Sequence, residues 1–591
     1  MNKTEKLICI LLGAVLAWYI WSEMGRTKER QKYLAEQAAI AATNAPAAPV
    51  ASVAVNSTNA PAAAAVAPAT AVKAAAALPS VPEEFVVLEN DELKLELSTW
   101  GAVVKKATLK KYAKDCGEIS EGNPPVEFDF SSAPLGRLGD IDGSDGYELK
   151  VVESSKTSAT FSVGGWTRKV TLGDGYLVTY EDQCLRDYTA ADQMPNTLSV
   201  GLMRMGDSKN DLLSVDSWAM DAGKGKEGVV HHCEGSSPLK GYLVGGLSGG
   251  CSGSKNAAGM PLETTVPYIG AQKWIALKNR FFVTALVSTT AENAGFSATV
   301  ARDAKAQAYK PESVSAVANV RTGAGATRSV FYVGPKKQSL LWDLGMKDVM
   351  EFGMWRWLCY PLVWVLNFFN NMIPNYGVAI ILLTILVRLL FWPLTHKSTV
   401  GMKKMQELQP KMKEIQAKFK DNPQRLQQET WALYRDNKVN PMSSCLPMLV
   451  QIPVFIALFN VLRSAVELRY ASFLWISDLS EPEALFASWF PFGGLNLLPI
   501  LMAATTALQS AFTPSTGDRS QQRMMMVFMP LMMLVMFYSF PSALSLYWFL
   551  SNVFSIVQMW IIRRQTAAKG EGPLVPEVID PPSTRQMRRH G

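Results

Sequence analysis

Arg388 is the residue of this chain whose position most needs a chemical explanation. It lies inside the apolar run 376–394, which is long enough to cross a bilayer and contains no other charged residue. A guanidinium near the middle of such a span costs about 2.5–3.5 kcal/mol, so a bundle interior or a water-filled cavity is expected around it. Because the other long apolar runs contain no Asp or Glu, we expect its counter-charge to arrive with a bound molecule.

Two threonines accompany this arginine. Thr384 precedes it by four residues and Thr395 follows it by seven, so a helix places all three on one face. Turned inward, the polar residues of the other apolar runs would line a hydrated groove with them; turned apart, they would hydrogen-bond between helices. The sequence allows both arrangements. These other residues are Gln451, Asn460, Thr505, Thr506, Gln509, Tyr547, Trp548, Asn552 and Gln558.

The distribution of apolar residues predicts a membrane protein, and 48% of the 591 residues are hydrophobic. We predict six crossings: an N-terminal anchor span and five core spans. A further stretch, 354–373, contains three tryptophans and predicts a helix in the interface plane, with a seventh span as the alternative. The six runs are at about 7–21, 376–394, 443–462, 496–512, 524–540 and 543–562.

The charges of the connecting segments predict the orientation. Segment 397–440 holds ten Lys and Arg against five Asp and Glu, and the tail 563–591 holds six against three. Loop 463–494 holds two against four. Short cytoplasmic loops carry the excess of basic residues. We therefore expect both termini in the cytoplasm and the large 80–340 region outside.

The N-terminal segment 1–25 predicts an uncleaved membrane anchor. Lys3 and Lys6 precede an apolar stretch, as in a secretory signal peptide, but the stretch ends without the small-x-small cleavage pattern. A cleaved signal peptide is the alternative. Four basic residues between 26 and 32 outnumber the two before the span, and this local excess favours the opposite orientation. We base the predicted orientation on the charges of the later loops.

The external region begins with a tether. Residues 26–80 are rich in Ala and Pro, and 21 of the 43 positions from 38 to 80 are Ala, so we predict a flexible linker. Residues 81–335 predict an antiparallel β-sandwich, because short runs alternate apolar and polar residues between turns. Sub-segments 205–260 and 291–326 predict long loops. The alternating runs are 93–97, 168–172, 176–180 and 328–332.

Motifs for catalysis or metal binding do not emerge from the sequence. Cys116, Cys184, Cys233 and Cys251 lie in the external region, and four cysteines allow three pairings. His231 and His232 beside two of them match no zinc spacing. Residues 249–255 lack the Gly-Lys-Ser/Thr ending of a phosphate loop, and no zincin or nucleophile-elbow motif is complete. We predict no cofactor, no metal and no enzyme activity.

The cytoplasmic segment 397–440 predicts a helical hairpin. Its second helix, roughly 424–437, offers Leu426, Trp431, Leu433 and Tyr434 as the surface that faces the first. Pro410 is expected to kink the first helix. The lysines form a solvated face or a docking surface for acidic partners or lipid head groups. The apolar stripe of the first helix is Met405, Leu408, Met412, Ile415 and Phe419.

The run 524–540 contains seven methionines in seventeen residues. Methionine is flexible and polarizable, and it is frequent on surfaces that accept varied apolar partners. The run therefore suggests a surface along which different helices slide. Ordinary packing against lipid or the protein core is the alternative for each methionine.

Several dense motifs resemble the YidC family of membrane protein insertases, to which mitochondrial and chloroplast insertases are related. The resemblance covers residues 353–564, about a third of the chain, and the external domain has the position expected of Gram-negative members. The motifs are VRLLFWPLT at 387–395, MQELQPK at 405–411, ALY at 432–434, VNPMSSCLPMLVQIPVF at 439–455, VELR at 466–469, FMP at 528–530 and FPSALSLYW at 540–548.

The resemblance implies an α-helical core, 376–562, whose five spans enclose a groove open to the cytoplasm and the lipid. A connecting and interfacial segment, 336–375, precedes this core in the chain. Arg388 takes the centre of the groove, with Thr384, Gln509, Tyr547 and Trp548 beside it. Members usually have Tyr-Tyr where this chain has Tyr547-Trp548, so a hydroxyl-dependent role at 548 is in doubt. A substrate slide is expected on two spans, at Met448, Ile452, Phe455, Met525, Met529 and Met533.

The resemblance also implies partners and a location. They are nascent membrane proteins, the Sec translocon and the lipid bilayer of the bacterial inner membrane, with no nucleic acid read directly. The ribosome is a further candidate, through the basic tail 563–591. Two other classes compete: an anion transporter that uses Arg388, and an anchored periplasmic enzyme or sugar-binding module. The chain lacks an internal repeat, an acidic coupling residue in the spans, and a convincing pair of catalytic carboxylates.

Overall fold

The computed structural model of the chain describes residues 83–568 with internal gaps. The gaps are 118, 140–148, 164, 185–193, 205, 207–212, 222–225, 233–262, 270–271, 303–310, 323–324, 351, 438, 440–445, 486–493 and 513–518. The predicted anchor 1–25, the linker 26–80 and residues 569–591 lie outside the described part, as do Cys233 and Cys251. The chain divides into two compact units. Segment Leu386–Lys397 belongs to one unit, and the residues on either side of it, Ala77–Ile385 and Ser398–Gly591, belong to the other.

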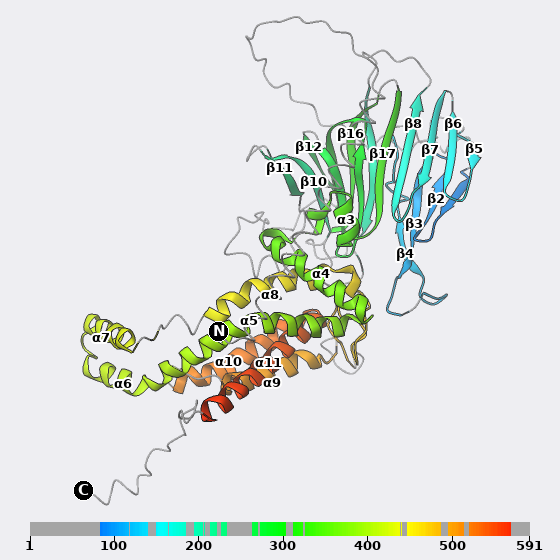
Figure 1. Cartoon of the computed structure of the whole chain (residues 1–591). Helices are drawn as coiled ribbons and strands as arrows, with labels where there is room; N and C mark the ends of the chain where they lie inside the picture. Colours follow the sequence, from blue (N-terminus) through cyan, green and yellow to red (C-terminus); the bar gives the residue numbers. More distant parts are fainter. Residues whose placement is uncertain are drawn as a thin grey trace, which may run out of the picture. The chain divides into compact units, whose positions relative to one another are not determined.

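Seventeen antiparallel strands in the described part form three sheets (Figure 1). The first sheet has the order β1-β2-β3-β4, the second β11-β10-β13-β14-β17-β8-β7-β6-β5, and the third β12-β15-β16-β9. Strand β9 of the third sheet contacts β13 and β14 of the second. The strands are β1 (Phe85–Glu89), β2 (Leu93–Ser98), β3 (Val103–Ala113), β4 (Pro125–Asp129), β5 (Lys150–Ser154), β6 (Ser158–Val163), β7 (Trp166–Leu172), β8 (Leu177–Cys184), β9 (Met194–Arg204), β10 (Ser214–Asp221), β11 (Lys226–His232), β12 (Glu263–Ile269), β13 (Gln272–Lys278), β14 (Phe282–Thr289), β15 (Glu292–Arg302), β16 (Pro311–Thr322) and β17 (Gly325–Pro335).

The alternating runs of the sequence are strands, as predicted. In β2 the side chains of Leu93, Leu95 and Leu97 are buried, whereas the intervening Lys94 and Glu96 are half-buried. The other three runs coincide with β7, β8 and β17, and the second of them begins one residue before β8. Alternation marks β2 because one of its faces is more deeply buried than the other, whereas in β17 the consecutive residues Phe331 and Tyr332 are both buried.

The prediction of long loops at 205–260 and 291–326 was wrong where β10, β11, β15 and β16 occur. Ala298 pairs with Ala316, and Ser297 pairs with Val317, across β15 and β16. Small residues are poor strand formers in isolation, but strand propensity depends strongly on the neighbours across the sheet. Burial of Phe296, Ala298 and Val300 on one face of β15 outweighs its weak local preference.

Arg168 and Asp182 form a buried charged pair in the β-rich domain, as do Lys278 and Asp216. Arg168 is fully buried, and its Nε and Nη2 donate to the carboxylate of Asp182 at 2.6 and 3.0 Å. Nη1 donates to the carbonyl oxygens of Gly101 and Gly136, each at 2.9 Å. The guanidinium also lies 5.1 Å from the centre of the Tyr180 ring. The Arg168–Asp182 pair thereby joins β7, β8 and two loops.

The helices follow the β-rich domain in the sequence (Figure 1). Helix α8 contacts α4 and α11, while α9 contacts α10 and α11. The helices are α3 (Gln338–Asp343), η2 (Lys347–Met350), η3 (Gly353–Trp355), α4 (Arg356–Met372), α5 (Tyr376–Glu407), α6 (Gln409–Lys418), α7 (Pro423–Asp436), α8 (Leu446–Ser464), η5 (Val466–Leu468), α9 (Leu497–Phe512), α10 (Arg519–Phe537) and α11 (Ser542–Ala568).

Each of the five apolar runs predicted as core spans coincides with a helix over most of its described residues, and the run 524–540 extends past the end of α10 at Phe537. Among the described residues, two helices are long and apolar enough to cross a membrane, namely α5 and the segment Ser542–Ile562 of α11. Shorter apolar helices occur at Gln451–Ser464, Leu497–Phe512 and Met526–Phe537. The predicted interfacial helix at 354–373 corresponds to η3 and α4.

Helix α5 is longer than the sequence suggested. The amide of Val378 donates to the side chain of Asn375 at 3.1 Å, which caps the N-terminus, and the helix continues past Pro393 to Glu407. Residues 398–407, which the sequence placed at the start of the hairpin segment 397–440, therefore continue the helix that contains the apolar run, and they include good helix formers such as Met, Lys, Gln and Glu. The expected kink near Pro410 takes the form of a break, because α5 ends at Glu407 and Leu408 separates it from the next helix. This helix, α6, begins with the proline in its first turn, where the missing amide hydrogen costs nothing.

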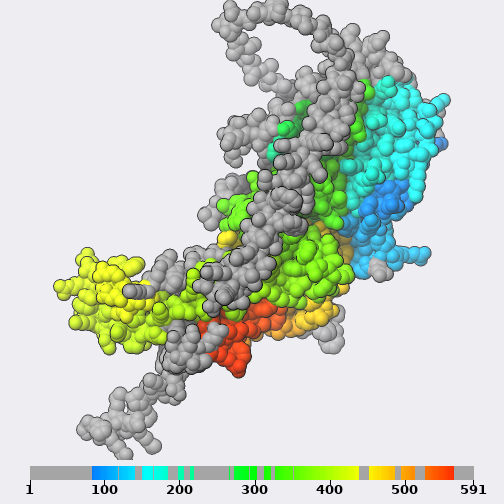
Figure 2. Space-filling view, in the orientation of Figure 1, coloured from blue at the N-terminus to red at the C-terminus, as the bar shows by residue number. Residues whose placement is uncertain are grey.

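The structure contains the predicted hairpin, but one residue expected in its interface is exposed. Met405, Leu408 and Val439 form a buried cluster against which Leu433 and Tyr434 pack. Trp431, which was expected on this surface, is 58% exposed. It precedes Leu433 by two residues, which turns it about 200° around the helix. The hairpin is the yellow and yellow-green group of atoms at the left of Figure 2.

We predict that Asp182→Ala destabilises the β-rich domain by about 3–5 kcal/mol, because it leaves the buried Arg168 without its carboxylate. The measurement is hydrogen exchange of the β7 and β8 amides in increasing urea. Glu181→Ala is the matched control: its partner Arg328 lies 3.8 Å away, both side chains are about half exposed, and it should cost less than about 1 kcal/mol. Equal effects of the two variants would contradict the assignment.

Candidate functional site

The polar face of α5 is ordered by the helix itself. Thr384 is fully buried, and its hydroxyl donates to the carbonyl oxygen of Ile380 at 2.7 Å. The hydroxyl of Thr395 lies 3.0 Å from the carbonyl oxygens of Phe391 and Trp392. Such bonds satisfy a hydroxyl without water. Arg388 is half-buried on the same helix, one turn after Thr384.

Trp548 belongs to an aromatic cluster that joins α8, α10 and α11. Its ring meets Phe455 edge-on at 4.9 Å and lies 5.4 Å from Phe537. Phe455 and Phe537 are themselves 6.0 Å apart. The sequence placed Phe455 on the slide and Trp548 in the groove, and the structure brings the two together. It adds Phe537, which the periodicity of a methionine-rich run did not distinguish. Tyr547, the other predicted aromatic, is buried in α11.

The polar residues between α9 and α11 bind one another. Asn552 donates to the hydroxyls of Thr506 at 2.8 Å and Thr505 at 3.3 Å, and to the carbonyl oxygen of Met502 at 3.4 Å. These residues form hydrogen bonds between helices, which was one of the two arrangements that the sequence left open. Gln509 follows Thr505 by one turn of α9 and is half-buried.

The exposed apolar stripe of α10 differs from the methionines predicted as a slide. Met529 and Met533 are half-buried, and on α8 Ile452 is 42% exposed whereas Phe455 is half-buried. The side chains of Met448 and Met525 lie outside the described residues. The repeat Val527, Leu531, Val535 at four-residue spacing could have revealed the stripe in the sequence. Its exposed residues are Val527, Phe528, Leu531, Met532 and Val535.

Acidic residues organise the loop between α8 and α9, and the sequence analysis missed them. The carboxylate of Glu483 accepts the amides of Leu497 at 2.9 Å and Leu498 at 2.6 Å, which are unpaired donors at the start of α9. It also accepts the indole of Trp475 at 3.2 Å. The carboxylate thus satisfies the helix end and complements its dipole. Among the described residues, no group of three or more His, Cys, Asp or Glu is arranged to hold a metal ion.

Glu467, in η5, is a second acidic residue at this loop. Its Oε1 is buried and has no hydrogen-bond partner among the described residues. Burial raises the pKa of this carboxyl above its ordinary value, and the charge of Lys337 opposes that shift only in part. The phenols of Tyr112, Tyr332 and Tyr376 interact electrostatically with it. Burial likewise raises the pKa of Asp478, so Glu467 is one of two carboxyls of this loop whose pKa lies above the ordinary range.

Comparisons with known proteins agree with these features. Residues 368–569 match the family described as the 60Kd inner membrane protein, and residues 262–365 match the YidC periplasmic domain. The membrane protein insertase YidC of Pelodictyon phaeoclathratiforme is 31% identical over 546 residues, or 86% of this chain and 88% of that protein. The insertase YidC of Syntrophobacter fumaroxidans is 42% identical over 299 residues, which span 49% of this chain and about half, 53%, of that protein.

A solved structure of an active YidC insertase is 18% identical and covers 82% of this chain and 93% of its own, with a TM-score of 0.33. The helices, the strands and the matched families define an inner membrane protein with a β-rich periplasmic domain. The chain belongs to the YidC family of membrane protein insertases.

We predict that Glu467 makes the stability of the full chain fall as the pH rises above the ordinary pKa of a glutamate carboxyl. Above that pH the folded carboxyl, with its raised pKa, keeps a proton that the unfolded one has released, and this contribution is lost as the pH rises through the folded pKa. Glu467→Gln should remove that part of the pH dependence, measured as the melting temperature in nanodiscs. Glu153 is exposed, so Glu153→Gln should leave the pH dependence of the melting temperature unchanged. Parallel curves for wild type and Glu467→Gln would refute the prediction.

Proposed function

We propose that this chain inserts nascent proteins into the bacterial inner membrane through a hydrated groove with Arg388 at its centre. The observation that carries the proposal is a guanidinium within a long apolar helix, in a chain of the insertase family. A charge at this depth marks a polar pathway, because hydrocarbon does not solvate it. Thr384, Gln509, Tyr547 and Trp548 are proposed to line the groove.

The physical role of the groove is to shorten the apolar distance that a polar segment must cross. Arg388 attracts an acidic or polar tail for a short time, while the following apolar segment moves along α8 and α10 into the lipid. Burial of that segment releases about 25 cal/mol per Å2 of apolar area. This gain drives insertion, so the reaction needs no nucleotide hydrolysis and no cofactor.

The proposal includes the arrangement of the whole chain. An anchor, 1–25, and a linker, 26–80, precede a periplasmic β-sandwich, 81–335, and both termini lie in the cytoplasm. Five spans within 376–562 form the core. The protein acts alone on small substrates and with the Sec translocon on larger ones, and the ribosome is a candidate partner of the basic tail.

We expect Arg388→Ala to reduce insertion of substrates whose translocated tail is acidic, because the attraction for that tail is lost, and Arg388→Lys to retain part of it. Complementation of a depletion strain, followed by protease protection of several substrates, measures this. Arg425→Ala, at an exposed site on α7, is the control. Undiminished insertion of every acidic substrate by Arg388→Ala would disprove the role.

Site-specific cross-linking to a stalled nascent chain tests the pathway. We expect products from positions 384, 388, 448 and 548. On α10 we expect more product from Met532, on the exposed stripe, than from the half-buried Met529, because a substrate from the lipid side reaches the exposed face first. The reverse ratio would assign the slide to the methionines that the sequence suggested.

A further inference from the structure

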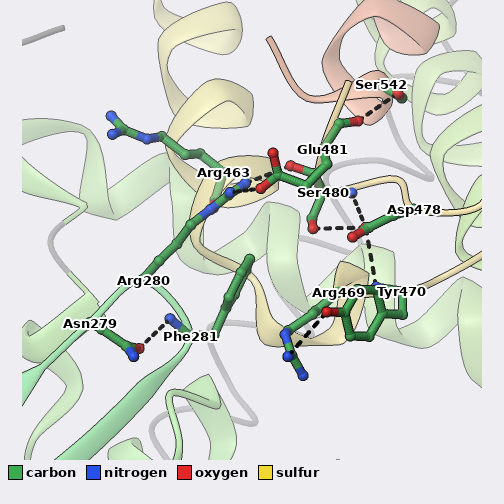
Figure 3. Close-up of polar contacts among 10 residues, drawn as sticks. All are labelled: Asn279, Arg280, Phe281, Arg463, Arg469, Tyr470, Asp478, Ser480, Glu481 and Ser542. Carbon is green, nitrogen blue, oxygen red and sulfur yellow. Dashed lines mark hydrogen bonds and ion pairs between the residues drawn. The ribbon is translucent and has the colours of Figure 1, made fainter. Parts of the chain in front are cut away.

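A buried arginine of the β-rich domain binds the loop between α8 and α9. Arg280 lies between β13 and β14 and is 3% exposed. Its Nε donates to the carbonyl oxygen of Arg463 at 2.8 Å, its Nη2 to that of Ser480 at 2.6 Å, and its Nη1 forms an ion pair with the carboxylate of Glu481 (Figure 3). Three nitrogens of one planar group thus hold one end of α8 and the loop that follows it.

The turn that presents Arg280 is itself held in place. The side-chain oxygen of Asn279 accepts the amides of Phe281 at 3.0 Å and Phe282 at 2.8 Å. Such a bond pattern closes a turn locally. The Arg280 guanidinium therefore projects from a fixed point of the sheet, and little ordering is left to be done when it binds the loop.

A second arginine makes the reverse contact, from the loop to the β-rich domain. Arg469 donates to the carbonyl oxygen of Ala113 at 2.8 Å and to that of Lys114 at 2.9 Å, at the end of β3. The hydroxyl of Tyr470 donates to the same Lys114 oxygen at 2.7 Å. The loop is attached at two places, through groups from both sides.

The same short loop also holds the start of α11. The carbonyl oxygen of Glu481 accepts the amide of Ser542 at 2.9 Å and its hydroxyl at 2.6 Å, and Leu479 accepts the amide of Ala543 at 2.9 Å. Ser542 and Ala543 are the first two residues of α11. Their amides are among the donors that a helix end leaves unpaired, so the loop supplies the cap that α11 needs.

The loop conformation depends on support from its surroundings. Tyr470, Leu474 and Ala484 have φ angles of 57°, 54° and 47°. Residues other than glycine rarely adopt this region, and they persist there when surrounding contacts outweigh the strain. The carboxylate of Asp478 adds internal bonds to the amides of Tyr470 and Ser480, at 3.1 and 2.7 Å (Figure 3). The two arginines provide the external support.

We propose that Arg280 is a positioning residue for the groove. It holds Ser480 and Glu481, Glu481 holds Ser542, and Ser542 begins the helix that carries Tyr547 and Trp548. Five residues of helix span roughly 8 Å, so a shift at the start of α11 is passed to the aromatic pair. The periplasmic domain thereby contributes to the geometry of the membrane part. The consequence for insertion depends on the function proposed above, whereas the consequence for α11 does not.

Hydrogen exchange of the full chain in nanodiscs tests the structural step. In Arg280→Ala, we expect the amides of Ser542 and Ala543 to exchange at least about 10-fold faster, a loss of about 1.4 kcal/mol of protection. Arg328→Ala, which removes an exposed arginine of β17 from the same domain, should leave them unchanged. Unchanged protection in Arg280→Ala overturns the proposal.

Insertion assays with the same variants test the functional step. We expect Arg280→Ala to reduce insertion and Arg280→Lys to retain part of it. A double charge exchange, Arg280→Glu with Glu481→Arg, should recover part of both insertion and protection. Should Arg280→Ala fail to fold, Glu481→Gln removes the ion pair while it keeps the backbone carbonyl, and the same two effects are expected at smaller size.

The outcomes separate the two proposals. Faster exchange with unchanged insertion overturns the role of Arg280 in positioning the groove. Faster exchange together with reduced insertion supports it. Full insertion by Arg388→Ala, with faster exchange in Arg280→Ala, refutes the charge-attraction mechanism and leaves the link between Arg280 and α11 standing.

Discussion

A polar group withdrawn from water must find its partners inside the protein, and this constraint governs both parts of the chain. The hydroxyls of Thr384 and Thr395 bind carbonyl oxygens of their own helix, and Asn552 binds the threonines of the neighbouring one. In the β-rich domain, Arg168 is buried with a carboxylate and two carbonyls. Arg388 is the one charged residue of an otherwise apolar run, and its position in that run makes it the centre of the proposed groove.

The helix ends obey the same rule through the loop between α8 and α9. Two glutamates, two residues apart, serve two different helices: the carboxylate of Glu483 caps α9, and the backbone carbonyl of Glu481 caps α11. The side chain of Glu481 remains available for Arg280 of the β-rich domain. One short segment therefore couples two helices and a sheet. Through Arg280, the β-rich domain is joined to the loop that caps both helices.

Much of the fold could be predicted, because burial leaves a periodic trace in the residue order. The alternation in β2 and the long apolar runs of α5 and α11 are such traces. The strands β15 and β16 show no such periodic pattern in the sequence, because their Ala and Ser residues are stabilised by partners across the sheet. Trp431 was assigned to the hairpin interface because it is apolar, yet its angular position turns it outward. The composition of α10 predicted an apolar helix. Only the packed structure shows that Met532 is exposed and Met529 half-buried.

The sequence by itself determined the family, the membrane character and the position of one charge in an apolar run, because each depends on residues that are close together in the chain. Only the tertiary structure decided which polar residues meet. Arg280 and Glu481 are separated by 201 positions, and Arg469 reaches Ala113 across 356. No local pattern relates residues at such distances. Their contacts depend on where the sheet and the loop lie in the folded chain.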